Sequence, residues 1–298
     1  MKPLARGLEF PEGPVAMGDG SVILCEIVGG RLTRVAADGK TDVVANLGGG
    51  PNGAAIGPDG RIYVCNNGGA QWEGGRIDVV DPRTGKWDVL YDNVDGHRLA
   101  GPNDIVFDTD DGFYFTDFGK TEGRVRHRGG IFWAKADGSH IREVIFPFNG
   151  DLNGIGLSPD NKTLYATETA AARVWSWEII GPGSVRRRPF PAAEGATLVA
   201  QLPGVARFDS MAVSQSGKIL VGTLRQGGIT EICPLTGAYK YYFLPDFLVT
   251  NLCFGGPDMT TCFVTMAHSG QLVELNWHEP GLRLSWQQPW QGRSESHT

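Results

Sequence analysis

An all-β fold, a six-bladed β-propeller with four antiparallel strands in each blade, is predicted by three features of this 298-residue sequence. The first is composition, because 43 glycines, 18 prolines and 8 tryptophans favour many short strands joined by tight turns. The second is a strand–turn–strand unit that recurs six times. The third is the lack of helical periodicity over any useful length of sequence. Together they predict a single domain spanning residues 1–298.

Each repeat begins with a polar residue, continues into a short apolar strand, turns at Asp, Gly, Ser or Asn, and ends in a second apolar strand. The six copies are EGPVAMGDGSVILCE (12–26), NGAAIGPDGRIYVCN (52–66), NDIVFDTDDGFYFTD (103–117), NGIGLSPDNKTLYATE (153–168), DSMAVSQSGKILVGT (209–223) and NLCFGGPDMTTCFVTM (251–266). The first residues of these copies, here named the opener residues, are Glu12, Asn52, Asn103, Asn153, Asp209 and Asn251. Because the first strand of every propeller blade lines the central channel, the opener residues are expected to form a ring around one end of it.

Two further strand candidates follow each repeat and complete a four-stranded blade. In order they are GRLTRVAADG with TDVVANL, RIDVVDPRTG with WDVLYDN, GIFWAKADGS with IREVIFPF, RVWSWEII with ATLVAQL, GITEICPLTG with AYKYYFLP, and QLVELNW with LRLSW. The last blade is therefore expected to end on LRLSW (282–286), and the sequence leaves open whether segment 2–9 closes that blade instead. A β-sandwich would not explain the fixed order of opener, turn and third strand. A WD40 propeller is disfavoured because no blade carries the Gly-His and Trp-Asp pair.

Charge and cysteine content narrow the partners and the compartment. A net charge of −6 and a pI near 5.5 argue against nucleic acid as the main partner. No run approaches the ~18 apolar residues of a membrane span, and the N-terminus lacks the apolar core of a signal peptide. The five cysteines are odd in number and show no CxxC spacing, which favours buried free thiols in a reducing compartment. We expect a cytoplasmic protein with no nucleic-acid or membrane partner, monomeric or a small homo-oligomer.

The predicted ring of opener residues holds two carboxylates and four side-chain amides. In a partly dry channel these groups would repel one another or stay unsatisfied without a cation. Calcium accepts six to eight oxygen ligands of this kind, and no His or Cys is among the openers. Ca²⁺ is the expected ion, with Mg²⁺, Mn²⁺ or Zn²⁺ as alternatives. The competing interpretation is that the Asn-Gly and Asn-Asp pairs only turn the chain into each blade; it is weakest for Glu12, since Glu is a poor turn residue.

Five segments, in blade order, carry a resemblance to a known family. They are FPEGP (10–14), GPNDIVFDTDDGFYFTD (101–117), NGIGLSPDNKTLYATET (153–169), FDSMAV (208–213) and TNLCFGGPDMTTCFVT (250–265). The chain resembles the gluconolactonase and senescence-marker-protein (regucalcin) family over essentially its whole length. The resemblance implies a calcium-dependent hydrolase that opens a lactone, mostly sugar-derived, to the hydroxy acid. It also implies metal ligation by Glu12, Asn103, Asn153 and Asp209, with Asp209 acting as base or nucleophile.

The resemblance gives less guidance on the substrate. Members of the family that act on sugar lactones often carry an Arg two residues before the Asn of Pro-Asn-Asp, but here Gly101 stands there and Arg98 lies further back. Glu122 corresponds to a glutamate that the family contributes from the loop after the third hairpin. A polyhydroxylated aldonolactone and a less polar, small aliphatic lactone therefore both stay open.

The remaining candidates for substrate binding come from their positions in the chain. Asn52 belongs to the opener ring, and His268 follows the second strand of the last blade, where it could reach the channel mouth. Trp72 and Glu73 lie on a glycine-rich loop that could cover the pocket. We assign Asn52, Trp72, Arg98, Glu122 and His268 to substrate binding. Asp117 and Glu168, at matching places after second strands, are expected to face the rim or pair locally.

Two other functions fit the same ring. The first is phosphotriesterase-type hydrolysis, in which the same metal would polarise a P=O bond. The second is a non-catalytic calcium-binding propeller, because propellers often serve as docking platforms and the fold alone does not settle function.

Overall fold

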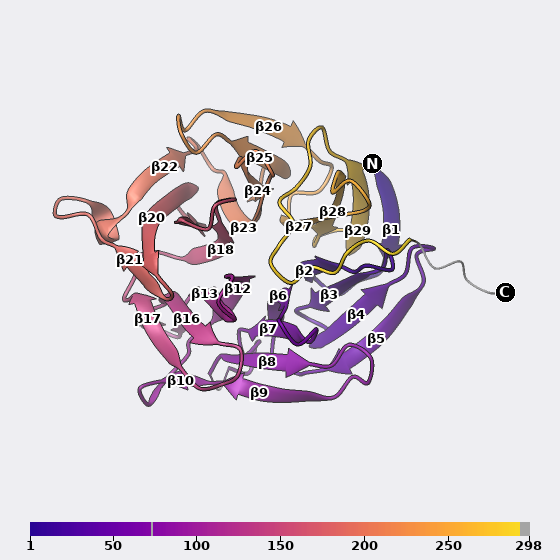
Figure 1. The fold of residues 1–298 in the computed structure, drawn as a ribbon, viewed down its shortest axis with the longest axis horizontal. Helices are drawn as coiled ribbons and strands as arrows, with labels where there is room; N and C mark the ends of the chain where they lie inside the picture. The colour runs from indigo at the N-terminus through magenta and orange to yellow at the C-terminus, as the bar shows by residue number, and fades with distance from the viewer. Residues whose placement is uncertain (73, 293–298) are drawn as a thin grey trace.

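The computed structural model describes residues 1–72 and 74–292. Six antiparallel sheets stand around a central axis as the blades of a propeller (Figure 1), which confirms the predicted fold class. Five of these sheets have four strands and one has five. Within the described ranges the helical structure is the short 3₁₀ turn η1 (Ala193–Gly195), and no helix there has the length and hydropathy of a membrane span.

The strands of each blade follow one another from the channel outwards. Blade 1 has β2 (Pro11–Ala16), β3 (Val22–Glu26), β4 (Arg31–Val35) and β5 (Thr41–Asn46), and blade 2 has β6 (Pro51–Ile56), β7 (Ile62–Asn66), β8 (Arg76–Val80) and β9 (Trp87–Tyr91). Blade 3 has β12 (Pro102–Phe107), β13 (Gly112–Asp117), β16 (Gly130–Lys135) and β17 (Ile141–Ile145). Blade 4 has β18 (Leu152–Leu157), β19 (Thr163–Glu168) and β20 (Arg173–Gly181), which pairs with both β21 (Ser184–Arg186) and β22 (Thr197–Gln201). Blade 5 has β23 (Arg207–Val213), β24 (Ile219–Leu224), β25 (Gly228–Ile232) and β26 (Tyr239–Phe243).

The structure also contains two small hairpins that were not predicted. They are β10 (Asn93–Val94) with β11 (His97–Arg98), and β14 (Lys120–Glu122) with β15 (Val125–His127).

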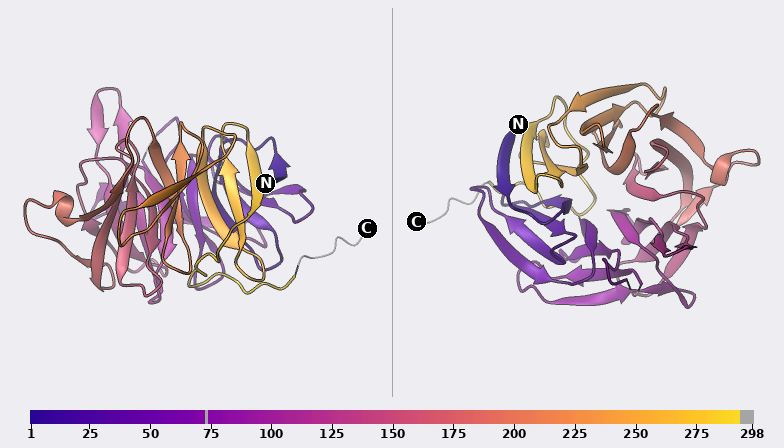
Figure 2. Two further views of the ribbon diagram at one scale, coloured as in Figure 1. Left: turned by 90° about the horizontal axis from the view of Figure 1, so that it is seen from above. Right: turned by 180° about the vertical axis from the view of Figure 1, so that it is seen from behind.

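Blade 6 differs from the prediction in its outer strand. Its order is β27 (Val249–Gly255), β28 (Thr261–Met266), β29 (Gln271–Asn276) and then β1 (Lys2–Arg6), so the first strand of the chain closes the ring. The prediction that 282–286 forms this strand is wrong. Residues 277–292, here named the strap, leave the blade and cross one face of the propeller in front of the channel (Figures 1 and 2). Pro280 cannot donate to a strand ladder, and the Leu282 N–H donates to Val213 O of blade 5 instead.

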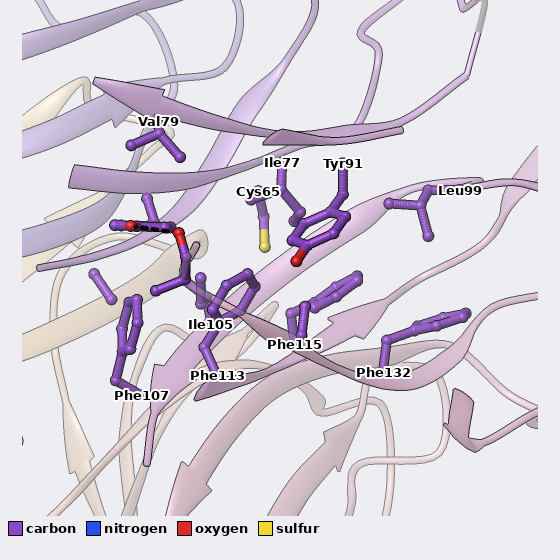
Figure 3. Close-up of a cluster of buried hydrophobic side chains, with 14 of the residues drawn as sticks. Cys65, Ile77, Val79, Tyr91, Leu99, Ile105, Phe107, Phe113, Phe115 and Phe132 are labelled. Atoms are coloured by element: carbon purple, nitrogen blue, oxygen red, sulfur yellow. Dashed lines mark hydrogen bonds between the residues drawn. The ribbon is translucent and has the colours of Figure 1, made fainter. Parts of the chain in front are cut away.

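Six clusters of buried apolar side chains hold the blades together, one at each interface between neighbours. Figure 3 shows the cluster between blades 2 and 3, where Cys65, Ile77 and Tyr91 lie opposite Phe113 and Phe115. Both faces of the inner strands are covered by a neighbouring blade, so these strands are apolar along their whole length. The outer strands β5 and β9 face solvent and are mostly exposed or half-buried.

A β-bulge interrupts the first hairpin of every blade at or beside its opener residue. The pairing shifts between Glu12 and Val15, Pro51 and Ala54, Pro102 and Ile105, Leu152 and Ile155, Phe208 and Met211, and Val249 and Asn251. A bulge leaves residues out of the ladder and can redirect their side chains. In each blade the bulge therefore takes the residues around the opener out of the regular pairing. These residues lie where the six first strands meet.

The residue after an opener is often small because the next blade lies against it. A Cβ atom on Gly53 would lie 2.5 Å from Asn103 O and 2.7 Å from Asp104 Oδ1. We expect Gly53→Ala to lower the free energy of unfolding by about 2 kcal/mol, since blade 3 must shift. Urea denaturation measures this, with Gly181→Ala as the matched control because no atom of the described part of the chain lies within 4 Å of a Cβ there. Equal stability of the two variants would contradict the close packing of blades 2 and 3.

Candidate metal and active site

The opener residues lie at equivalent positions on the six innermost strands. These strands contact one another in the circular order β2, β6, β12, β18, β23, β27, and back to β2. All six opener side chains are buried, from Glu12 at 2% exposed to Asp209 at 8%. The ring is also joined across blades, because Asn251 Nδ2 of blade 6 donates to Glu12 Oε2 of blade 1 at 2.7 Å. The structure thus brings together the four residues predicted to bind metal; their role as ligands stays a prediction.

Three buried carboxylates interact at this ring. Burial, followed by the charges of Asp209 and Asp104, raises the pKa of Glu12 well above its usual value. Burial raises the pKa of Asp209 to about 7, and the nearby charge of Asp104 adds to that effect while a hydrogen bond from Asn153 opposes it. The three acids repel one another in a dry site, which is the electrostatic setting that a bound cation relieves.

Asp104 is a site residue that the sequence interpretation did not assign. Its Oδ1 accepts the N–H of Ile105 at 3.0 Å, and its Oδ2 accepts the N–H of Ile155 on blade 4 at 3.2 Å. It also accepts hydrogen bonds from the Met211 backbone and the Ser210 side chain of blade 5, while burial raises its pKa to about 7. Asp104 therefore ties the first strands of blades 3, 4 and 5 together beside the ring. One feature of the sequence could have identified Asp104. It is an acid at the second position of a repeat, where most copies have a small residue.

Two amide oxygens of the ring have no hydrogen-bond partner within residues 1–72 and 74–292. Asn52 Oδ1 and Asn103 Oδ1 are both buried and unsatisfied. Leaving a buried acceptor unpaired costs about 1–3 kcal/mol, so such atoms usually mark a missing partner. Oxygen from amides and carboxylates is the donor set that Ca²⁺ and Mg²⁺ prefer. The ring residues therefore fit a hard divalent cation, and Asn52, which the sequence analysis assigned to substrate binding, lies among the candidate ligands.

Buried threonine hydroxyls on the second strands support the ring from behind. Thr167 Oγ1 of blade 4 accepts the Gly154 N–H at 2.7 Å and donates to Asp209 O of blade 5 at 2.7 Å. Thr116 Oγ1 of blade 3 likewise accepts the Asp104 N–H at 3.1 Å and donates to Asn153 O of blade 4. In both cases a hydroxyl of one blade fixes the opener backbone of the next.

Removing one of these hydroxyls should loosen the ring without touching its carboxylates. We expect Thr167→Val to lower the free energy of unfolding by about 2 kcal/mol, because it leaves a buried N–H and C=O unpaired. We also expect Ca²⁺ affinity, measured by calorimetry, to fall about tenfold, and Thr167→Ser to restore it. Thr230→Val is the matched control, since it removes a buried hydroxyl pair with Thr223 on the second and third strands of blade 5. Equal loss of Ca²⁺ affinity in both variants would show that the effect is general destabilisation.

The loops that follow the second strands lie at the opener end of the channel, because each second strand ends opposite the start of a first strand. Asp117 pairs with Pro102 in this way, and its carboxylate accepts the N–H groups of Ala100, Gly101 and Gly119 at 2.7–2.8 Å. Burial raises the pKa of Asp117 to about 6. Glu168 accepts the Trp175 Nε1–H at 2.9 Å. Asp117 and Glu168 were expected either to face the rim or to pair locally, and the structure shows local partners for each of them.

Three of the residues assigned to substrate binding gather over blades 2 and 3. The Trp72 ring contacts the His127 ring in a tilted arrangement with ring centres 4.7 Å apart, and Glu122 Oε2 lies 3.4 Å from His127 Nε2. Arg98 borders the same loop, since its Cδ lies 3.4 Å from the position of a Cβ on Gly74. Glu73, predicted on this loop, lies outside the described residues. His127 contacts two of these residues, and the sequence interpretation did not assign it.

His268 lies apart from that group, on blade 6. It is exposed and its ring contacts the tilted ring of Phe247, with ring centres 4.1 Å apart. The backbone around it is fixed by Asp246, whose Oδ2 accepts the Ser269 N–H at 2.8 Å. The structure therefore places His268 on the rim with an aromatic partner, and no contact joins it to the opener ring among the described residues.

Comparison with known proteins adds a family match over most of the chain. The SMP-30/Gluconolactonase/LRE-like region matches residues 10–268. The lactonase drp35 of Staphylococcus saprophyticus is 30% identical over 226 residues, which cover 75% of this chain and 66% of the relative. The gluconolactonase of Zymomonas mobilis is 26% identical over 92% of this chain and 77% of its own. This chain thus spans slightly less than two thirds of the staphylococcal protein.

Solved structures show the same fold. A gluconolactonase from Xanthomonas campestris superposes with a TM-score of 0.74 at 20% identity, covering 91% of this chain and 86% of that one. A calcium-binding protein, regucalcin, from Agrobacterium tumefaciens superposes with a TM-score of 0.72 at 18% identity, covering 95% and 97%.

Proposed function

The chain belongs to the SMP-30/gluconolactonase/LRE-like family, and from this membership we propose that it is a metal-dependent lactonase that opens a cyclic ester to the hydroxy acid. The observation that carries the metal dependence is the pair of unpartnered amide oxygens of Asn52 and Asn103, buried beside three carboxylates that repel one another. A calcium ion is the ligand that fits best, because the whole donor set is oxygen.

In this proposal Glu12, Asn103, Asn153 and Asp209 hold the ion, with Asn52 beside them. When bound, the ion would supply Lewis-acid polarisation of the lactone carbonyl, which typically lowers a barrier by several kcal/mol. As a base, the Asp209 carboxylate takes the proton of the attacking water and returns it to the ring oxygen when the ester C–O bond breaks. As a nucleophile, it adds to the carbonyl carbon, the ring C–O bond breaks, and water then hydrolyses the mixed anhydride. The Asp209 pKa of about 7 suits a group that accepts a proton near neutral pH.

The surroundings of Gly101 favour the less polar of the two substrate classes. A Cβ atom at this position would lie 2.8 Å from Gly119 O, so the backbone leaves no room for a side chain there. The nearby wall is formed by the rings of Trp72 and His127, which are in contact at a tilt. A small aliphatic or aryl-substituted lactone suits such a wall better than a polyhydroxylated sugar lactone.

A panel of five- and six-membered lactones, sugar-derived and aliphatic, tests the function with a pH indicator. Acid release that stops with EDTA and returns with Ca²⁺ is the expected result. Calcium-dependent stabilisation without turnover on any lactone would instead support the non-catalytic calcium-binding propeller. Faster turnover of a phosphotriester than of every lactone would favour the phosphotriesterase alternative.

The state of the cysteines bears on the compartment in which the protein works. All five cysteines are free, three of them buried, while Cys233 and Cys253 are half-buried. Free thiols at every position suit a reducing compartment such as the cytoplasm. We place the lactonase there, as a monomer or small homo-oligomer whose partner is a small-molecule lactone.

A further inference from the structure

The central channel continues past the opener ring as a cavity of about 290 Å³. Gly13, Asp104 and Asn251 line its inner end, so the ring closes the cavity on that side. Strap residues 282–287 line its outer end on the opposite face of the propeller. The cavity is thus separate from the loops around Trp72 and His127, where we place the lactone.

The wall of this channel cavity is mainly apolar. It is built from the second halves of the first strands, which contribute Val15, Ile56, Phe107, Leu157, Val213 and Phe254. Met211 also lies on the wall, and its Cε would be 3.8 Å from a Cβ on Gly156. The charged lining residues of the described chain are Asp104 and Arg283, one at each end. Both carboxylate oxygens of Asp104 accept backbone N–H groups, and Arg283 donates to Gln288 O at 3.4 Å.

The strap is a fixed part of the cavity. Leu282 N donates to Val213 O at 2.8 Å, and Gln287 Nε2 donates to Phe254 O at 2.7 Å. Nearer the start of the strap, the Glu279 carboxylate accepts a hydrogen bond from Ser216 Oγ at 2.7 Å and forms an ion pair with Lys218 at 3.1 Å. These bonds tie the strap to blades 5 and 6.

An entrance remains on the side of the cavity away from those blades. Thr109 of blade 3 and Pro159 of blade 4 line the cavity and are exposed, as are strap residues 283–285. These exposed lining residues place the opening of the cavity between the strap and the turns of blades 3 and 4. A small molecule can enter there.

An apolar cavity of this size favours an apolar occupant over water. A buried water needs two to four polar partners, and a dry apolar cavity of roughly 150 Å³ is large enough to bind benzene. Displacing poorly held water from an apolar wall is favourable for an apolar group. Asp104 and Arg283, at the two ends, already have hydrogen-bond partners. The described lining residues therefore offer no charged group to pair with a charged ligand.

We propose that the channel cavity is a second binding site, distinct from the opener ring, for a neutral aliphatic molecule with a chain of roughly six to ten carbons. The chain lies along Met211, Val213 and Phe107, and a terminal hydroxyl points to the rim near Thr109 and Ser285.

Titration with 1-octanol tests this proposal on the full chain with its calcium bound. The protein has five methionines, so ¹³C-methyl labelling gives one reporter on the wall, Met211, and an exposed reporter at Met1. We expect a saturable shift of the Met211 methyl signal, assigned with Met211→Leu, and an unchanged Met1 signal. No Met211 shift up to the solubility limit of octanol overturns the site.

Filling the cavity provides the second arm. Val213→Trp should weaken octanol binding at least tenfold, while Val43→Trp on the exposed face of β5 should leave it unchanged. Should Val213→Trp fail to fold, Ala55→Leu fills the same cavity from blade 2 with a smaller side chain. Undiminished binding in a folded filled variant overturns the site. Because octanol has no ester, the result is independent of whether the protein hydrolyses lactones.

Discussion

Asp209→Asn is expected to lower kcat/KM for lactone hydrolysis by about a thousandfold while leaving the fold unchanged. Removing a positioned proton acceptor typically costs 10²–10⁴ in rate. The change is isosteric, and the Asp209 backbone stays bonded to Thr167 through its carbonyl oxygen. The asparagine can still offer an oxygen to a cation, so the loss reflects the missing carboxylate more than a missing ligand atom. Steady-state kinetics on the best lactone of the panel measure it.

The matched control is Asp42→Asn on the exposed outer strand β5, which should keep full activity. The wild-type rate should also rise with pH, because Asp209 must lose its proton to act, and its pKa of about 7 in the metal-free site is the upper end of that rise. Activity of Asp209→Asn within threefold of wild type would remove Asp209 from the chemistry.

The ring could be predicted from sequence because it depends on repetition. Six aligned hairpins fix six equivalent positions, and propeller symmetry then brings Glu12 and Asp209 together although 196 residues separate them. The bulges that free the opener regions could not be read from the pattern, because they change the pairing and leave the alternation of apolar residues intact. The contribution of Asp104 was missed for a related reason: its hydrogen bonds join three blades, and no local pattern encodes contacts across blades.

The closure of blade 6 shows a second limit. LRLSW alternates apolar and polar residues, whereas KPLAR holds Lys, Pro and Ala, which are depleted in strands, so local propensity favours the wrong segment. The choice is made by tertiary structure, since β1 completes the last sheet and leaves the strap to cover the channel. The channel cavity could not be predicted from the sequence for the same reason, because its cover is the strap, a segment without a repeat.

Removal of calcium is expected to make the stability of the protein strongly dependent on pH. In the metal-free protein burial raises the pKa of Asp209 from 3.8 to about 7, so the folded state holds a proton that the unfolded state has released between about pH 4 and pH 7. Stability must fall as pH rises through that window, and Asp209 alone accounts for roughly 4 kcal/mol at its upper end. For a domain of this size the loss corresponds to a decrease in Tm on the order of 10 °C. Thermal unfolding in EDTA at pH 5, 6, 7 and 8 measures it.

Calcium should reverse this dependence, because the ion binds the deprotonated carboxylates and its affinity rises as they lose their protons. We therefore expect the gain in Tm on adding Ca²⁺ to be small at pH 5 and largest at pH 8. Asp209→Asn separates this effect from general acid sensitivity, since it removes one of the titrating groups and should flatten the pH dependence of the metal-free protein. A metal-free Tm that stays constant from pH 5 to pH 8 would mean that the three carboxylates are not held together in the folded chain. Without their repulsion, the main physical reason for a cation in the channel would be gone.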